Sequence, residues 1–84
     1  MIMNQVPADT LTFITEAVVE HIVAKFQLDE FAALEKFLHS KTYDLLIDEE
    51  NKIWHLSPLA ICDIFDVEAK TGNPLDSAYL RGDA

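Results

Sequence analysis

Apolar side chains recur every three or four residues in the first third of the chain, and this spacing constrains the fold more than any other feature. They are Leu11, Ile14, Val18, Ile22 and Phe26, and Phe13, Ala17 and Ala24 widen the set. Such spacing places the side chains on one face of an α-helix. We therefore predict a helix over residues 10–26, with Asp9 or Thr10 as the cap that accepts a hydrogen bond from a free first-turn N–H.

A second apolar stripe follows after a short turn and predicts a second helix. The stripe consists of Phe31, Leu34, Phe37 and Leu38. Asp29 is a suitable N-cap, and Glu30 beside it interacts favourably with the positive end of the helix. Because so few residues separate the two stripes, we expect the two helices to pack as an antiparallel pair.

The strongest helix start in the sequence is the dipeptide Ser57-Pro58, with Leu56 before it. Ser57 can cap a helix, and Pro58 fits the first turn, where its missing N–H costs nothing. Gly72 suits the left-handed residue after a helix, so we predict a helix over residues 58–71. Its apolar face consists of Ile61, Cys62, Phe65 and Ala69 with Leu59 close by, and Asp63, Asp66 and Lys70 lie outside that face.

The segment between these helices allows two interpretations. In the first, Ser40 caps a helix over residues 40–48, and an acidic loop follows. In the second, a β-hairpin spans residues 43–56. Its loop would contain no glycine, whereas tight hairpin turns prefer Asn-Gly or Asp-Gly. The sequence therefore favours the helix.

Together these elements predict an all-α fold, a small bundle of three to four short helices in one domain over residues 1–84. The alternative is an α+β fold with the hairpin across residues 43–56. Residues 1–8 form a lead-in. Residues 73–84 form a tail that can pack back on the bundle through Leu75, Tyr79 and Leu80.

The chain is short for its apolar content. It has 84 residues, of which 50% are hydrophobic. A chain of this length buries only about 60–65% of its unfolded surface, so some apolar surface remains for another interface. We therefore expect a homodimer.

The net charge restricts the possible partners. Six Lys and Arg against fifteen Asp and Glu give −9 at pH 7, and the cations are spread singly along the chain. A field of this sign repels the phosphates of nucleic acids and anionic membranes. We expect no direct nucleic-acid binding and no membrane binding, but a protein partner, which the charge allows to be basic.

Several signals predict a cytoplasmic protein. The N-terminus shows no basic start followed by a long apolar stretch, as a signal peptide would. The apolar runs are far shorter than the roughly 20 residues of a membrane span. Cys62 is the only cysteine, so no intrachain disulfide can form.

Residues with catalytic or metal-binding potential are few and poorly spaced. The three histidines and Cys62 never lie three or four residues apart, as two ligands on one helix face would. Cys62 also lies on a predicted buried face, where a reactive thiolate is disfavoured. The acidic run 48–50 lacks the pattern of an EF-hand loop. The sequence therefore predicts no enzymatic activity and no cofactor.

Residues 39–56 combine aromatic, histidine and acidic side chains. Tyr and Trp are frequent in binding hot spots because they bury a large area and keep a polar group. For Trp54, a place in the core is the favoured interpretation, and a place in an interface is the alternative.

The leading hypothesis for the chain is a non-enzymatic protein-interaction module; the alternative is a small-ligand or metal-binding regulatory domain. The candidate binding residues are His39, Tyr43, Asp48, Glu49, Glu50, Trp54 and His55.

The segment from Phe37 to Leu46 also resembles a known pattern. It reads Phe-Leu-His-Ser-Lys-Thr-Tyr-Asp-Leu-Leu, with Ser57 downstream. It is similar to the aromatic-x-His-Ser-x-Thr-Tyr-x-Leu pattern of a group of small uncharacterised bacterial proteins. Some of these proteins are similar to companions of toxin-like genes, so the resemblance implies a bacterial cytosolic protein with an antitoxin-like or accessory role. It implies no catalytic residues.

Overall fold

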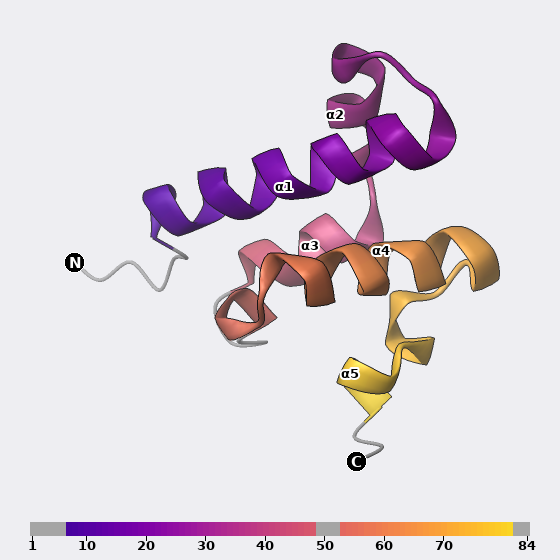
Figure 1. Ribbon diagram of the computed structural model, residues 1–84. Helices are drawn as coiled ribbons and strands as arrows, with labels where there is room; N and C mark the ends of the chain where they lie inside the picture. The colour runs from indigo at the N-terminus through magenta and orange to yellow at the C-terminus, as the bar shows by residue number, and fades with distance from the viewer. Residues whose placement is uncertain (1–6, 49–52, 82–84) are drawn as a thin grey trace.

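The computed structural model describes residues 7–48 and 53–81, and all regular structure in these ranges is helical (Figure 1). The predicted all-α fold of short helices is therefore confirmed. The alternative hairpin across residues 43–56 is wrong in its described part. Helix α3 covers Lys41–Ile47, close to the predicted 40–48, and the short 3-10 helix η2 covers Ile53–His55.

Helix α1 (Ala8–Phe26) starts earlier than predicted. Pro7 occupies the N-cap position, and no side chain of the described residues caps the helix, so the assignment of Asp9 or Thr10 as the cap was wrong. Asp9 lies in the first turn instead, where its charge favours the positive helix end. Gln27 ends the helix in the left-handed conformation, with φ 57°.

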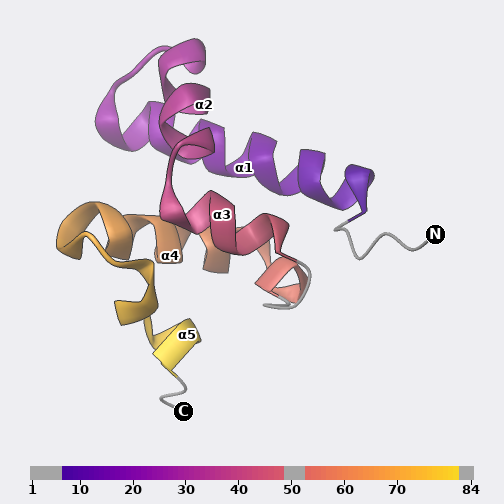
Figure 2. The same ribbon diagram turned by 180° about the vertical axis from the view of Figure 1, so that it is seen from behind.

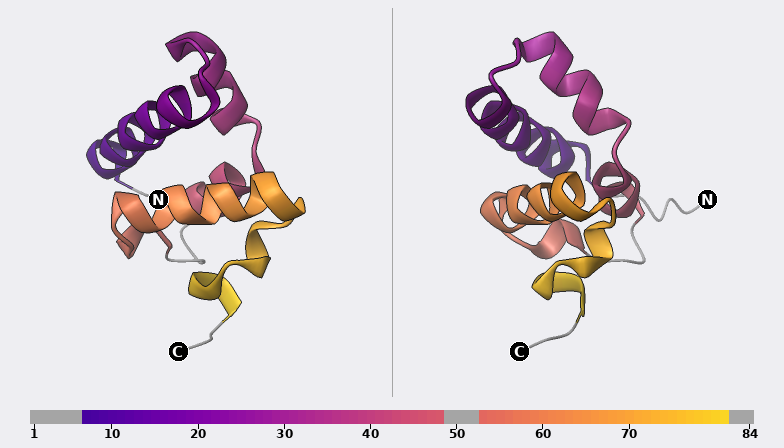
Figure 3. Two further views of the ribbon diagram at one scale, coloured as in Figure 1. Left: turned by 45° about the vertical axis from the view of Figure 1, so that its right-hand side comes forward. Right: turned by 90° about the vertical axis from the view of Figure 1, so that its right-hand side faces the viewer.

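Helix α2 (Glu30–Leu38) begins as predicted, because the Asp29 carboxylate accepts a hydrogen bond from Ala32 N at 2.7 Å. It packs against α1. However, α2 crosses α1 steeply and does not lie antiparallel beside it (Figures 1 and 3). The left-handed turn at Gln27 redirects the chain at this point.

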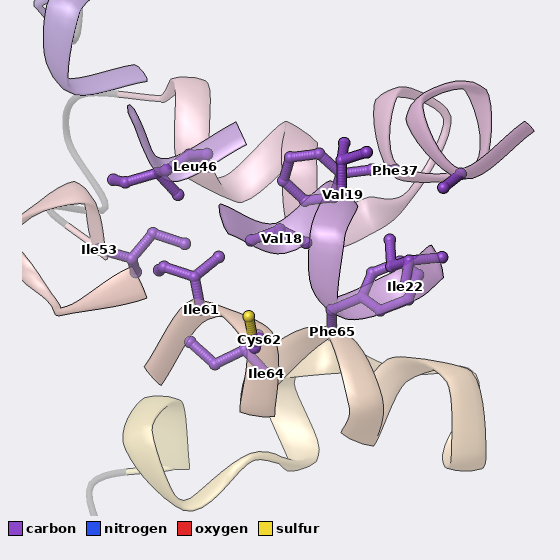
Figure 4. Close-up of a cluster of buried hydrophobic side chains, with 12 residues drawn as sticks. Val18, Val19, Ile22, Phe37, Leu46, Ile53, Ile61, Cys62, Ile64 and Phe65 are labelled. Carbon is purple, nitrogen blue, oxygen red and sulfur yellow. The ribbon is translucent and has the colours of Figure 1, made fainter. Parts of the chain in front are cut away.

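Helix α4 (Pro58–Thr71) packs against α1 and α3 and so completes the core. As predicted, Ser57 Oγ accepts a hydrogen bond from Ala60 N at 3.2 Å, and Gly72 ends the helix with φ 85°. Figure 4 shows how the apolar faces of the helices meet. The core cluster consists of Ile14, Val18, Val19, Ile22, Ala33, Phe37, Leu46, Ile53, Ile61, Cys62, Ile64 and Phe65.

Several apolar side chains that the helical spacing places on or beside buried faces are exposed instead. They are Phe13, Phe31, Leu38 and Leu59, together with the smaller Ala24 and Ala69. Each predicted stripe is wider than the surface that a crossing helix covers, so the residues at its edges remain in solvent.

The tail packs back on α4, and of the three side chains predicted to pack, Leu80 does so. It forms the 3-10 helix η3 (Pro74–Asp76), which contacts α4, and the short helix α5 (Ala78–Arg81). Figure 1 shows this segment turning back below α4. The buried or packed side chains are Pro74, Ser77 and Leu80, whereas Leu75 and Tyr79 are exposed.

Candidate functional site

The described residues among the seven predicted to bind a partner do not form one cluster. His39 directly precedes the turn into α3, Asp48 directly follows α3, and both are exposed. Because α3 has seven residues, its two ends lie roughly 10 Å apart at about 1.5 Å per residue. Glu49 and Glu50 lie outside the described residues.

Tyr43 belongs to the edge of the core. Its ring meets the ring of Phe37 edge-on, with centroids 5.3 Å apart and an interplanar angle of 75°. Phe37 is fully buried and also meets Phe65, at 6.1 Å between centroids. Aromatic pairs in this geometry contribute about 0.5–1.5 kcal/mol beyond the area that they bury. Tyr43 therefore stabilises the fold and offers only part of its ring to a partner.

Trp54 and His55 form a stacked pair in η2. Their ring centroids are 4.0 Å apart, and the ring planes are inclined by 26°. Trp54 is half-buried and packs against the core cluster, which agrees with the favoured interpretation, whereas His55 is exposed. The Nε1 atom of Trp54 is buried, and no described residue accepts a hydrogen bond from it. These contacts place Trp54 at the edge of the core.

The carboxylate of Glu68 connects α4 to the start of α3, which the sequence analysis did not predict. Oε2 accepts a hydrogen bond from Lys41 N at 2.9 Å. Oε1 accepts one from Thr42 N at 2.8 Å and another from Thr42 Oγ1 at 2.7 Å. The first N–H groups of a helix have no partner within it, and the positive helix end favours an anion. Glu68 therefore caps α3 from a distant part of the chain.

Two neighbouring interactions strengthen this connection. Ser40 Oγ accepts a hydrogen bond from Tyr43 N at 3.1 Å and donates one to Phe37 O at 2.6 Å, so Ser40 caps α3 as predicted. Lys41 Nζ donates to Gly72 O at 3.2 Å, at the negative end of α4. Figure 2 shows α3 alongside α4. We name the following set the α3–α4 polar cluster: Ser40, Lys41, Thr42, Glu68 and Gly72.

The α3–α4 polar cluster gives the Ser-Lys-Thr-Tyr part of the sequence pattern a structural role. Ser40 and Thr42 are 7% and 0% exposed, so neither hydroxyl is available to a partner. Both hydroxyls and the amides of the first turn bond within the domain. We conclude that this stretch stabilises the junction of two helices.

A second polar cluster joins α1 to α4. Asp66, predicted to lie outside the apolar face, has a side chain that is only 20% exposed. Its carboxylate lies 3.0 Å from His21 Nε2 and 3.1 Å from Lys25 Nζ. Lys25 is half exposed, and such pairs contribute only about 0–1 kcal/mol to stability. The cluster therefore adds only a small contribution to the packing of α1 against α4.

Cys62 is buried, as predicted. Its residue is 5% exposed, and Figure 4 shows the sulfur directed from α4 into the core cluster. Burial, followed by the charges of Asp66 and Asp63, raises the pKa of the Cys62 thiol from 9.0 to about 11. Only the thiolate is a nucleophile, so this environment opposes covalent chemistry at Cys62.

We expect native Cys62 to react slowly with thiol reagents. At pH 8 a pKa of about 11 leaves a thiolate fraction about 100-fold below that of the unfolded chain. The raised pKa favours the neutral thiol in the fold. Its contribution to stability is therefore complete below pH 9 and is lost as the pH rises from 9 toward 11. The low reactivity of the folded thiol is tested by the rates of reaction with a disulfide reagent, measured with and without guanidinium. Rapid labelling of the folded protein at pH 8 would contradict the prediction.

A groove of about 410 Å³ lies between α1 and α2. Val19 and Leu34 form its apolar floor, and Thr15 lies beside them. Three exposed glutamates surround it. We name it the α1–α2 groove, and its lining residues are Thr15, Glu16, Val19, Glu20, Glu30 and Leu34.

His39 lines a second groove, of about 520 Å³, between α2 and α4. Lys36, Glu35 and Glu68 contribute charges of both signs, and Glu68 is already engaged with α3. Neither aromatic residue of the 39–56 segment lines this groove. Of the residues predicted for a small-ligand site, His39 lines this groove, and Tyr43, Trp54 and His55 do not.

Within residues 7–48 and 53–81, no group of three or more His, Cys, Asp or Glu side chains is placed to hold a metal ion. Within them, too, no helix has both the length and the apolar character needed to cross a membrane.

Comparisons with models of protein families, with curated proteins and with solved structures find no match for this chain. The resemblance of residues 37–46 to the His-Ser-x-Thr-Tyr pattern therefore stays a prediction.

Proposed function

We propose that this chain is a non-enzymatic protein-interaction module with an antitoxin-like or accessory role in the bacterial cytoplasm. The observation that carries the proposal is an apolar stripe on α2, made of Phe31, Leu34 and Leu38. Helical spacing places these residues on one side of α2. Phe31 is 74% exposed and Leu38 is 40% exposed. Neighbouring exposed apolar side chains with a polar border are typical of interaction surfaces, whereas single ones are not.

The charge of the chain selects the kind of partner. The net charge is −9, and exposed Glu30 and Glu35 lie on the same helix as the α2 apolar stripe. Electrostatic complementarity favours a basic partner and accelerates its association. A basic protein surface with apolar side chains at its centre would match both the negative charge and the α2 apolar stripe.

Affinity purification of the tagged chain from its native host tests the proposal. We expect a stoichiometric partner of basic isoelectric point. The double variant Phe31→Ser/Leu38→Ser should lose this partner, and the matched variant Leu59→Ser/Leu75→Ser, also at exposed positions, should keep it. Recovery of no stoichiometric partner at any salt concentration, or equal recovery with both variants, would overturn the proposal.

The homodimer predicted from the apolar content belongs to this proposal. Seven large apolar side chains are at least 40% exposed among the described residues, which leaves surface for a second copy. We expect light scattering after gel filtration to give twice the 9.5 kDa mass of one chain. A single species of 9.5 kDa at high protein concentration would contradict the dimer.

A further inference from the structure

The α1–α2 groove has a floor that suits apolar side chains. Val19 is 9% exposed, and Leu34 is half-buried and packs against the core cluster. Leu34 belongs both to this floor and to the α2 apolar stripe, in which exposed Phe31 precedes it by about one helical turn. Together they form one apolar surface beside the core.

The rim of the groove carries three negative charges without compensation. Glu16 and Glu20 lie one turn apart on α1, and Glu30 is the first residue of α2. All three are exposed, and no residue that lines the groove is a Lys or Arg. His21 and Lys25 pair with Asp66, which does not line the groove. Cations of a partner would relieve the mutual repulsion of the three carboxylates.

We infer that the α1–α2 groove binds a basic amphipathic helix of the partner protein, an inference that rests on the proposed function and adds the partner's chemistry. Such a helix lays an apolar stripe into a groove through residues spaced three and four apart. The apolar stripe of the partner's helix contacts Val19, Leu34 and Phe31 of this chain. Lys or Arg side chains that flank the partner's stripe pair with the three glutamates of the rim.

Charge decides against two other occupants of the groove. A second copy of this chain has the same acidic rim, so two grooves that face each other repel. The phosphates of a nucleic acid meet the same repulsion. A basic helix alone satisfies both the floor and the rim.

The probe for the test is a synthetic helical peptide of leucine and lysine, with leucine along one face and a fluorescent label. A second peptide has glutamate in place of lysine, and a third has the lysine peptide's composition in an order without an apolar face. Fluorescence anisotropy should show binding of the first peptide, weakening as salt increases, and little binding of the other two. Equal binding of the first and third peptides would overturn the inference, because the apolar floor would then play no part.

Two triple variants with the same change of charge separate the groove from the general acidity of the surface. One is Glu16→Gln/Glu20→Gln/Glu30→Gln, in the groove. The other is Asp44→Asn/Asp63→Asn/Asp76→Asn, at exposed positions elsewhere. Each changes the net charge from −9 to −6, since three carboxylates are lost.

The groove variant should raise the Kd of the lysine peptide by about tenfold or more, and the control variant by less than about twofold. Equal weakening by both variants, or no effect of either, would overturn the inference. Circular dichroism should show that both variants stay folded, because all six positions are exposed. In the affinity purification, a partner kept by the groove variant overturns the groove but not the proposed function. If no partner is recovered, the proposed function fails, and the peptide assay still decides whether the groove binds a basic helix.

Discussion

Replacing Glu68 with glutamine is expected to lower the free energy of unfolding by about 2 kcal/mol, because hydrogen bonds to a charged group contribute about 1.5–3 kcal/mol each. Both carboxylate oxygens of Glu68 accept hydrogen bonds from α3, at 2.9 Å from Lys41 N and 2.8 Å from Thr42 N. A glutamine of the same shape would place its NH₂ group against one of these donors. One first-turn N–H of α3 would therefore lose its partner, and the negative charge at the positive helix end would disappear.

Thermal and urea denaturation followed by circular dichroism measure this effect, which corresponds to a fall in Tm of about 10 °C for a domain of this size. Glu35→Gln is the matched control, since Glu35 is an exposed glutamate and no described residue bonds to its side chain. We expect the control to change stability by less than about 0.5 kcal/mol. Equal effects of the two substitutions would show that the α3–α4 polar cluster adds nothing to stability.

Replacing Phe37 with alanine is expected to destabilise the protein most, by about 3–5 kcal/mol. The side chain is fully buried, and its ring contacts Tyr43 and Phe65 at 5.3 Å and 6.1 Å between centroids. Alanine would leave a cavity where α2, α3 and α4 meet, and it would remove both aromatic contacts. Small domains have a total stability of about 5–15 kcal/mol, so much of the fold's stability would be lost.

Phe31→Ala is the control for this prediction, because Phe31 lies in the same helix and is 74% exposed. Urea denaturation should show little change for Phe31→Ala and a large fall of the midpoint for Phe37→Ala. A Phe37→Ala variant within 1 kcal/mol of the unsubstituted protein, about the size of an ordinary substitution, would contradict the central position of Phe37 in the core.

Helix caps were predictable where a few neighbouring residues decide them. Asp29, Ser40 and Ser57 each accept a hydrogen bond from the backbone three residues later, so the signal is local. The start of α1 was not predictable in this way, because Asp9 and Thr10 can act either as caps or as residues of a first turn. Pro7, whose φ is restricted, precedes the first helical residue instead.

The extent of the buried faces could not be predicted from the sequence. Helical spacing shows which residues share a face, but the crossing direction of the next helix decides how much of that face is covered. Phe31 and Leu38 lie on the predicted stripe of α2, but they are exposed because α2 crosses α1 steeply (Figure 3). The same effect produced the exposed apolar surface on which the proposed function rests.

The polar contacts between helices could also be predicted only in part. Glu68 lies four residues after Ile64 and seven after Ile61, so helical spacing puts this carboxylate among buried side chains. An acidic residue on an apolar face indicates a partner within the fold. The partner, Thr42, is 26 residues away, and no local pattern identifies it. The rim of the α1–α2 groove is also assembled from two separate helices.

The connection between Glu68 and α3 determines how the domain unfolds. A helix of seven residues is too short to persist alone in water. The caps of α3 include a side chain from α4. The buried Leu46 of α3 belongs to the core cluster that α4 completes. Once α4 separates from the bundle, α3 loses both supports at once. The amide hydrogens of α3 therefore exchange with solvent at least as fast as α4 separates from the bundle.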